Sequence, residues 1–226
     1  MKVPFENRRE AGRILAGLLQ TRGFGSETVI LGLPRGGIPV AYEVALVLHA
    51  PLDVFIVRKL GVPGHNELAM GAIASGGARV LNNDVVYELD IRQSEIDRVA
   101  AMESEELARR EQAYRDGLSP VPLAGRHVVL VDDGLATGAS MRAAVLGVRA
   151  HAPVGVVVAV PVAPAETCAE LNDIADEAIC AATPEPFYAV GLWYRQFDPT
   201  SDDEVRELLA RAAGREPASS GFLRRS

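Results

Sequence analysis

Short apolar runs that alternate with longer amphipathic stretches are the feature of this sequence that most restricts its fold. Segments with helical periodicity separate the runs. Alternation of this kind indicates an α/β fold with a parallel sheet covered by helices on both faces. Ligands of such sheets bind beyond the carboxyl ends of the strands, so the residues directly after each run are candidate site residues. The runs lie at 29–33, 53–57, 127–131, 154–160 and 177–181.

Length and charge limit the classes of function. The chain has 226 residues, of which 48% are hydrophobic and 23% charged, so it can bury one sizeable core. Acidic residues number 30 against 23 basic ones, which argues against nucleic acid as a partner. The opening residues lack an apolar signal core, and no apolar run approaches the ~20 residues of a membrane span. We therefore expect a cytoplasmic protein without a membrane partner.

The two cysteines, Cys168 and Cys180, form no CxxC motif. Their spacing suits neither a disulfide framework nor a zinc site. Cysteines of cytosolic proteins generally stay reduced. We therefore expect two reduced thiols with a structural role.

Residues 128–140 carry the strongest chemical signal. The first four predict a buried strand that delivers Asp132 and Asp133 to its carboxyl end, and a turn of small residues then enters a helix. Backbone N–H groups at a helix start bind phosphate, and the hydroxyls of Thr137 and Ser140 stand beside them. Two carboxylates next to an anion site are expected to bind sugar hydroxyls or the waters of a divalent cation.

Three other interpretations of this segment can be compared with the sequence. A P-loop requires GxxxxGK[ST], and the chain has no Gly-Lys pair. A phospho-acceptor receiver domain requires a later lysine, and no lysine follows Asp133. A strand, a turn and a capped helix without any ligand is the plain structural alternative.

Cations follow two further runs. Residues 33–37, Leu-Pro-Arg-Gly-Gly, follow the first run, and Arg35 offers a forked cation suited to phosphate. The two glycines let the backbone approach a ligand closely. Arg58 and Lys59 follow the second run and are expected to face an anion, with solvated side chains as the alternative. Residues 61–67, rich in glycine and polar residues, predict a mobile loop beside them.

Aromatic residues gather near the end of a chain in which they make up only 5%. Residues 186–194 contain Phe187, Tyr188, Trp193 and Tyr194. A planar base stacks well on such rings. A small hydrophobic cluster that closes the fold is an equal alternative.

These motifs resemble the type I phosphoribosyltransferase family. Residues 128–140 are similar to its phosphoribosyl pyrophosphate (PRPP) signature: apolar strand, acidic pair, two variable residues and a Thr-Gly-small-Ser/Thr turn. FENRREAG, GLPRGG, VRKLG and ELAMGAI resemble a less characterised subgroup of predicted phosphoribosyltransferases, so the likeness covers about residues 5–210. The resemblance implies a Rossmann-like parallel-sheet core with a small hood built from the terminal segments, and a requirement for Mg²⁺.

The resemblance also implies roles for single residues. Asp132 and Asp133 would hold the ribose hydroxyls and, through water, Mg²⁺, while 136–140 would wrap the 5′-phosphate. The 33–37 loop would hold pyrophosphate and in the family often contains a strained or cis non-proline peptide, here expected near 34–36. Residues 61–67 would close over the site. Phe187 or Tyr188 would cover the base. The implied PRPP-binding residues are Arg35, Gly36, Gly37, Lys59, Asp132, Asp133, Gly134, Ala136, Thr137, Gly138, Ala139 and Ser140, and the implied catalytic residues are Arg35, Arg58, Lys59, Asp132 and Asp133.

One departure from the family pattern concerns the base. Hypoxanthine-guanine enzymes carry an Asp, a candidate proton acceptor, where this chain has Ala136. We expect transfer of a phosphoribosyl group to a nitrogenous base of unidentified type, in a homodimer. The alternative is a PRPP- or nucleotide-binding sensor without turnover. The expected domain spans 1–213, with hood elements at 182–200 and a flexible tail at 214–226.

Overall fold

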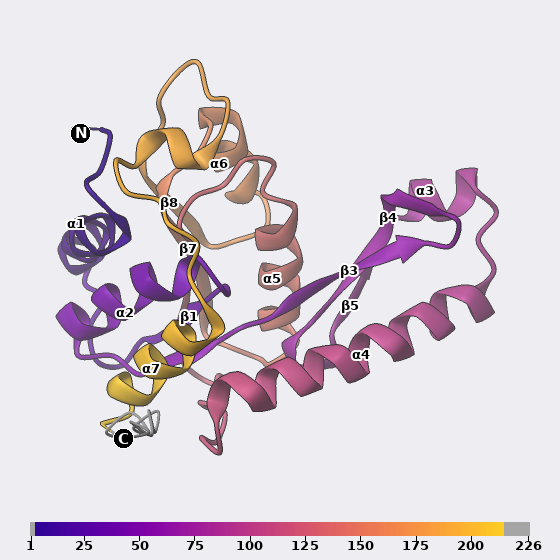
Figure 1. The fold of residues 1–226 in the computed structure, drawn as a ribbon, viewed down its shortest axis with the longest axis horizontal. Helices are drawn as coiled ribbons and strands as arrows, with labels where there is room; N and C mark the ends of the chain where they lie inside the picture. Colours follow the sequence, from indigo (N-terminus) through magenta and orange to yellow (C-terminus); the bar gives the residue numbers. More distant parts are fainter. Residues whose placement is uncertain (1–2, 215–226) are drawn as a thin grey trace, which may run out of the picture.

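The computed structural model describes residues 3–214, and its centre is a parallel sheet of five strands (Figure 1). Every neighbouring pair in this sheet is parallel, which confirms the predicted α/β class. The strand order is β2-β1-β6-β7-β8. The strands are β1 (Val29–Gly32), β2 (Leu52–Val54), β6 (His127–Val131), β7 (Gly155–Val162) and β8 (Glu177–Ala182).

Helices cover both faces of the sheet because its strands present apolar side chains on both sides. Val129 and Val131 of β6 pack toward α1 (Arg8–Thr21) and α2 (Gly37–Leu48). Val128 and Leu130 pack on the other face, toward α5 (Ala139–Arg149). Side chains of a strand alternate between faces, so each strand residue serves one of two cores. A further helix, α6 (Ala165–Leu171), lies on the α5 side.

An arm projects from the sheet (Figure 1). It consists of an antiparallel sheet, the short α3 (Asn83–Glu88) and the long α4 (Gln93–Arg115), which packs Ile96 and Leu107 against the arm strands. The last helix, α7 (Asp202–Ala212), packs on α2 and on α4. The arm strands are β3 (Val57–Val62), β4 (His65–Ala74) and β5 (Arg79–Leu81), and β4 and β5 form an antiparallel hairpin.

The apolar run at 53–57, expected to be one strand, belongs to two sheets. The parallel strand β2 ends at Val54, and β3 of the arm begins at Val57. Between them the N–H of Ile56 donates to Oγ of Ser75, 2.8 Å away, so the chain turns toward the arm. The expectation that Arg58 and Lys59 directly follow a strand of the central sheet is therefore wrong. Both lie inside β3.

The mobile loop expected at 61–67 is also corrected. These residues form the tip of the β3–β4 hairpin, where Val62 pairs with His65 across a two-residue turn. Pro63 and Gly64 make this turn, and Gly64 has a φ of 79°, which favours glycine. The tip lies at the far end of the arm from the central sheet (Figure 1).

The two terminal segments meet over one end of the sheet, as the expected hood requires. Phe5 pairs with Tyr194 in a parallel bridge, and the rings of Phe5 and Tyr194 lie 5.6 Å apart. Val162 of β7 lies beneath this cluster. Of the predicted tail, 214–226, all but Gly214 lies outside the described residues.

Cys168 of α6 and Cys180 of β8 form a disulfide, so the expectation of two reduced thiols is wrong. Their Cα atoms lie 6.4 Å apart because α6 packs directly against β8. Sequence spacing does not reveal this proximity, since the fold creates it. Within the described residues, no helix is both long enough and apolar enough to span a membrane.

Candidate active site

A cavity of about 380 Å³ lies beyond the carboxyl ends of β1 and β6. Pro34 and Arg35 line it after β1, and Asp132 and Ser140 line it after β6. This is where a parallel sheet of this kind is expected to bind its ligand. The sequence motifs at 33–37 and 128–140 therefore meet at one cavity.

The acidic pair stands at the mouth of β6. The N–H of Asp133 donates to Oδ1 of Asp132, 2.8 Å away, and Oδ2 of Asp133 accepts from Nε of Arg8 at 2.8 Å. The hydroxyl of Tyr194 donates to the carbonyl oxygen of Asp133 at 2.5 Å. The hood and the first turn of α1 therefore hold the backbone and the side chain of Asp133.

Burial gives the pair unusual electrostatics. Burial and the neighbouring Asp133 carboxylate raise the pKa of Asp132 well above its usual range. Burial also raises the pKa of Asp133, although the Arg8 guanidinium opposes that rise. Two carboxylates that share one partly buried place favour a cation or hydrogen-bond donors between them.

The turn after the acidic pair forms an open cradle at the start of α5. Gly138, which precedes the helix, has a φ of 69°, and Ala136, Thr137 and Ser140 are exposed. The first N–H groups of a helix have no intrahelical acceptor, so they can donate to a phosphate. The hydroxyl of Thr167 in α6 donates to the carbonyl oxygen of Ala136, 2.9 Å away, and supports the turn.

Glycines let the 33–37 loop lie directly against the acidic pair. A Cβ atom on Gly36 would lie 2.0 Å from Oδ2 of Asp133, and one on Gly37 would lie 2.9 Å from Cα of Asp132. Side chains are thus excluded at both positions. The peptide bond between Pro34 and Arg35 is cis, as the resemblance implies for this loop.

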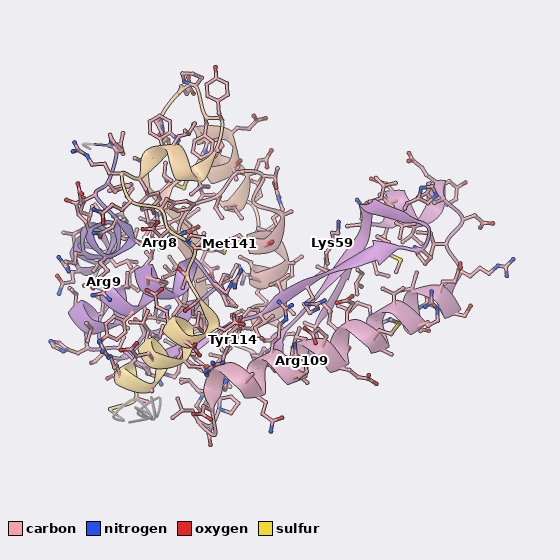
Figure 2. All side chains as sticks on the ribbon, in the orientation of Figure 1. Arg8, Arg9, Lys59, Arg109, Tyr114 and Met141 are labelled. Atoms are coloured by element: carbon pink, nitrogen blue, oxygen red, sulfur yellow. A yellow bond between two sulfur atoms is a disulfide. The ribbon has the colours of Figure 1, made fainter. Side chains whose placement is uncertain are left out.

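The structure separates the other predicted site residues from this cavity. Arg58 forms an ion pair with Glu103 of α4, and Lys59 is exposed on the arm (Figure 2). The ring of Phe187 stacks on Trp193 in the hood, with centroids 6.1 Å apart, and Tyr188 is 78% exposed. None of these four predicted residues is part of the cavity lining.

Several cavity residues were not predicted from the sequence. Tyr114, Arg109 and Arg110 come from the end of α4, and Asp202 and Arg206 come from α7. Both helices have the pattern of ordinary charged surface helices. No local motif marks the face that they turn to the cavity. Arg8, the partner of Asp133, had a weak signal in the FENRREAG opening.

The donor atoms of the site can be compared with the needs of the Mg²⁺ that the resemblance implies. In the part of the chain that the structure describes, no group of three or more His, Cys, Asp or Glu residues could hold a metal ion alone. Asp132 and Asp133 supply hard oxygen atoms, the ligand type that Mg²⁺ prefers, and Mg²⁺ usually keeps several waters. The pair therefore fits an ion whose remaining ligands come from water and from substrate.

Comparison with known proteins decides the family. Residues 6–183 match the model of the family described as phosphoribosyl transferase domain. The chain belongs to this family. Two curated relatives, each named "Putative phosphoribosyl transferase", come from Mycobacterium tuberculosis strains CDC 1551 and H37Rv. Each is 51% identical over 208 residues, which are 92% of this chain and 47% of the relative. The chain thus spans about half the length of these curated relatives.

A solved relative supports the fold of this phosphoribosyltransferase family member. The crystal structure of TT1426 from Thermus thermophilus superposes with a TM-score of 0.81 at 43% identity. The match covers 92% of this chain and 98% of that one. The central sheet and the arm therefore belong to a fold that this relative shares over nearly its whole length.

Proposed function

We propose that this chain transfers the 5-phosphoribosyl group of PRPP to a ring nitrogen of a base and releases pyrophosphate. One observation carries the proposal. Asp132 of the acidic pair, Ser140 at the start of α5 and Arg35 line one cavity at the carboxyl edge of the sheet. Residues 1–213 are proposed to act as one domain. A homodimer and a cytoplasmic location are further parts of this proposal.

The binding role follows from the chemistry of each part. The N–H groups at the start of α5 and the hydroxyls of Thr137 and Ser140 bind the 5′-phosphate. Asp132 and Asp133 accept hydrogen bonds from the ribose hydroxyls. A bound Mg²⁺, held near this pair through water, would neutralise charge on the diphosphate. These contacts fix the anomeric carbon, so positioning supplies part of the rate.

Departure of pyrophosphate is the main electrostatic obstacle in this reaction. Arg35 lines the cavity beside the acidic pair, and its guanidinium offers several N–H donors to a phosphate. Such fixed donors stabilise charge that develops in the transition state. Ala136 stands where hypoxanthine-guanine enzymes carry a proton acceptor, so this proposal assigns no side chain as a general base.

The acceptor base is proposed to bind under the hood. Val190 of the hood lies against Gly134, where an added Cβ would come within 2.5 Å of it. Phe187 and Tyr188 belong to the same terminal segment and remain the proposed ring contacts. The hood thus adjoins the turn that follows the acidic pair.

Pyrophosphate release with a panel of free bases tests the proposal. Wild-type protein, PRPP and Mg²⁺ are incubated with each base, and released pyrophosphate and the nucleotide product are both measured. Asp133→Asn is the matched inactive variant, and we expect weaker PRPP binding with a retained fold. Tight PRPP binding without pyrophosphate release for any base would show that the protein is a sensor and not an enzyme. The absence of PRPP binding would overturn both.

The sensor is kept as a second candidate because of the arm. The loop at 61–67, expected to close over the site, is the tip of the β3–β4 hairpin instead. Arg58 is bound to Glu103 rather than turned to the cavity. An enzyme of this kind has to exclude water in another way.

A further inference from the structure

Three arginines that come from outside the motifs line the same cavity. Arg109 and Arg110 lie in the last two turns of α4, and Arg206 lies in the second turn of α7. We call these three residues the arginine wall. Their side chains are 67%, 46% and 39% exposed, so a ligand in the cavity can reach them.

The end of α4 is fixed in place, so the wall has a defined position. The hydroxyl of Tyr114 donates to Oδ1 of Asp202 at 2.8 Å, which joins α4 to α7. Nε of Arg115 lies 2.9 Å from Oδ1 of Asp53, which joins α4 to β2. The side chains of Arg115 and Asp53 are only 13% and 7% exposed. Figure 2 shows Tyr114 and Arg109 where α4 reaches the core.

The wall and Arg35 make one side of the cavity rich in positive charge. Four arginines and two aspartates, Asp132 and Asp202, are its charged lining residues. Arg35 lies 3.9 Å from Asp202, which places it beside the wall. Asp202, Asp203 and Glu106 are the carboxylates that pair with these four arginines, so the cations outnumber them.

Glu106 partly neutralises Arg109 and Arg110 of the arginine wall but does not use all of their hydrogen-bond donors. Nε of Arg109 and Nε of Arg110 each lie 2.7 Å from a carboxylate oxygen of Glu106. Hydrogen bonds from Arg109 and then Arg110 lower the pKa of Glu106 to about 2, so it stays ionised. Nη1 of Arg58 lies 3.9 Å from the same carboxylate, so one carboxylate faces three guanidinium groups. Each guanidinium has five N–H donors, which leaves capacity for a second acceptor.

We propose that the arginine wall binds the diphosphate group of the phosphoribosyl donor, together with Arg35. This inference rests on the proposed function, because it assumes that the sugar lies over the acidic pair. With the 5′-phosphate in the cradle and the ring at Asp132, the diphosphate is the anionic group left for this side. Guanidinium groups match phosphate oxygens in geometry and charge, whereas a neutral base gains less from them.

Calorimetric titration with inorganic pyrophosphate and Mg²⁺ tests the wall directly. We compare wild type, the double variant Arg109→Gln with Arg110→Gln, and Arg206→Gln. Loss of charge-assisted hydrogen bonds should weaken pyrophosphate binding by about 10- to 100-fold. Ribose 5-phosphate, which lacks the diphosphate, should bind each variant as it binds wild type. Arg98→Gln is the matched control, since Arg98 lies on the same helix and outside the cavity lining.

A second variant tests the proposal in the opposite direction. Glu106→Gln removes the carboxylate that Arg109 and Arg110 share, so pyrophosphate should bind more tightly than to wild type. This variant keeps the proposal testable if the double arginine variant does not fold, which circular dichroism would show.

The wall is overturned if pyrophosphate binds all these variants equally, if wild type does not bind it, or if ribose 5-phosphate loses the same affinity. Failure of the transferase proposal has a separate readout. Wild type that binds PRPP and pyrophosphate but forms no nucleotide with any base would be a sensor. Weaker pyrophosphate binding by the wall variants would still support the wall in that protein.

Discussion

Nε of Arg8 lies 2.8 Å from Oδ2 of Asp133, and the two side chains are 12% and 15% exposed. The same guanidinium lies 3.8 Å from the centroid of the Phe197 ring and donates to the carbonyl oxygen of Asp198. Arg8 thereby ties the acidic pair to the hood. Arg9, its neighbour in the chain, is exposed (Figure 2).

Arg8→Ala should lower the free energy of unfolding by about 1–3 kcal/mol, because it leaves a partly buried carboxylate without its cation. Urea denaturation measures the change. Arg9→Ala is the control and should leave the free energy of unfolding nearly unchanged. Equal effects of the two substitutions would show that the contact with Asp133 contributes little.

Asp132→Asn should stabilise the ligand-free protein, because it removes one of two neighbouring carboxylates that share a partly buried place. We expect a rise of about 2–6 °C in the unfolding midpoint at neutral pH, equivalent to about 1–2 kcal/mol. The folded-state pKa of Asp132 is raised, so its contribution to stability is present at low pH and is lost as pH rises through that pKa. The advantage of the variant should therefore shrink as pH falls. Scanning calorimetry across a pH series measures this, and a constant difference would argue against the buried charge.

Gly36→Ala should abolish PRPP binding, because the new methyl group would meet Oδ2 of Asp133 at 2.0 Å. The loop or the carboxylate has to move, and the proposed sugar site loses its geometry. Gly17→Ala is the control, since nothing lies within 4 Å of a Cβ there and Gly17 is an exposed position of α1. That control should raise stability by up to about 1 kcal/mol. Calorimetry with PRPP and thermal unfolding give both results.

Arg35→Gln and Arg58→Gln should have different effects. Arg35 lines the cavity, so its loss should reduce the rate of pyrophosphate release by about 100-fold, equivalent to ~3 kcal/mol. Arg58 pairs with Glu103 on the arm, so its loss should lower stability and leave the rate close to that of wild type. Steady-state assays and thermal unfolding of both variants separate these effects. If the Arg58→Gln variant released pyrophosphate slowly but had normal stability, Arg58 would have to be assigned to the active site.

The central sheet and the strand-and-turn segment at 128–140 could be predicted because local sequence determines their structure. Val128–Val131 forms a strand by its apolar run, and the turn at 136–140 follows from its small residues. The division between β2 and β3 could not be predicted, because residues 53–57 are nearly continuously apolar. No residue in this run marks the point where the chain leaves one sheet and enters the other. What separates them is the contact of Ile56 with Ser75, nineteen residues later in the chain.

The arginine side of the cavity could not be predicted for a similar reason. Arg109 and Arg206 lie almost a hundred residues apart and meet only because α4 packs on α7. In the sequence, Arg58 and Lys59 are the cations next to an apparent strand end. This position favours the interpretation that they bind the pyrophosphate group. The structure brings α4 to that place and turns Arg58 into a partner of Glu103.

Replacing Cys168 and Cys180 by serine should lower the free energy of unfolding by about 2–3 kcal/mol, as expected for a loop closed by residues twelve positions apart. Chemical denaturation of the double variant and of wild type, each with and without reductant, measures the change. Reductant should affect only wild type. An equal response of the double variant would mean that the reductant acts elsewhere.

Thr167, which holds the carbonyl group of Ala136, is the residue before Cys168. The covalent link between α6 and β8 therefore lies one residue from the support of the turn that is proposed to bind the 5′-phosphate. A sample purified in dithiothreitol and one purified in air then differ in the covalent state of a residue next to the proposed binding surface. Affinities measured on one should not be compared with affinities measured on the other until the thiol content of each has been counted.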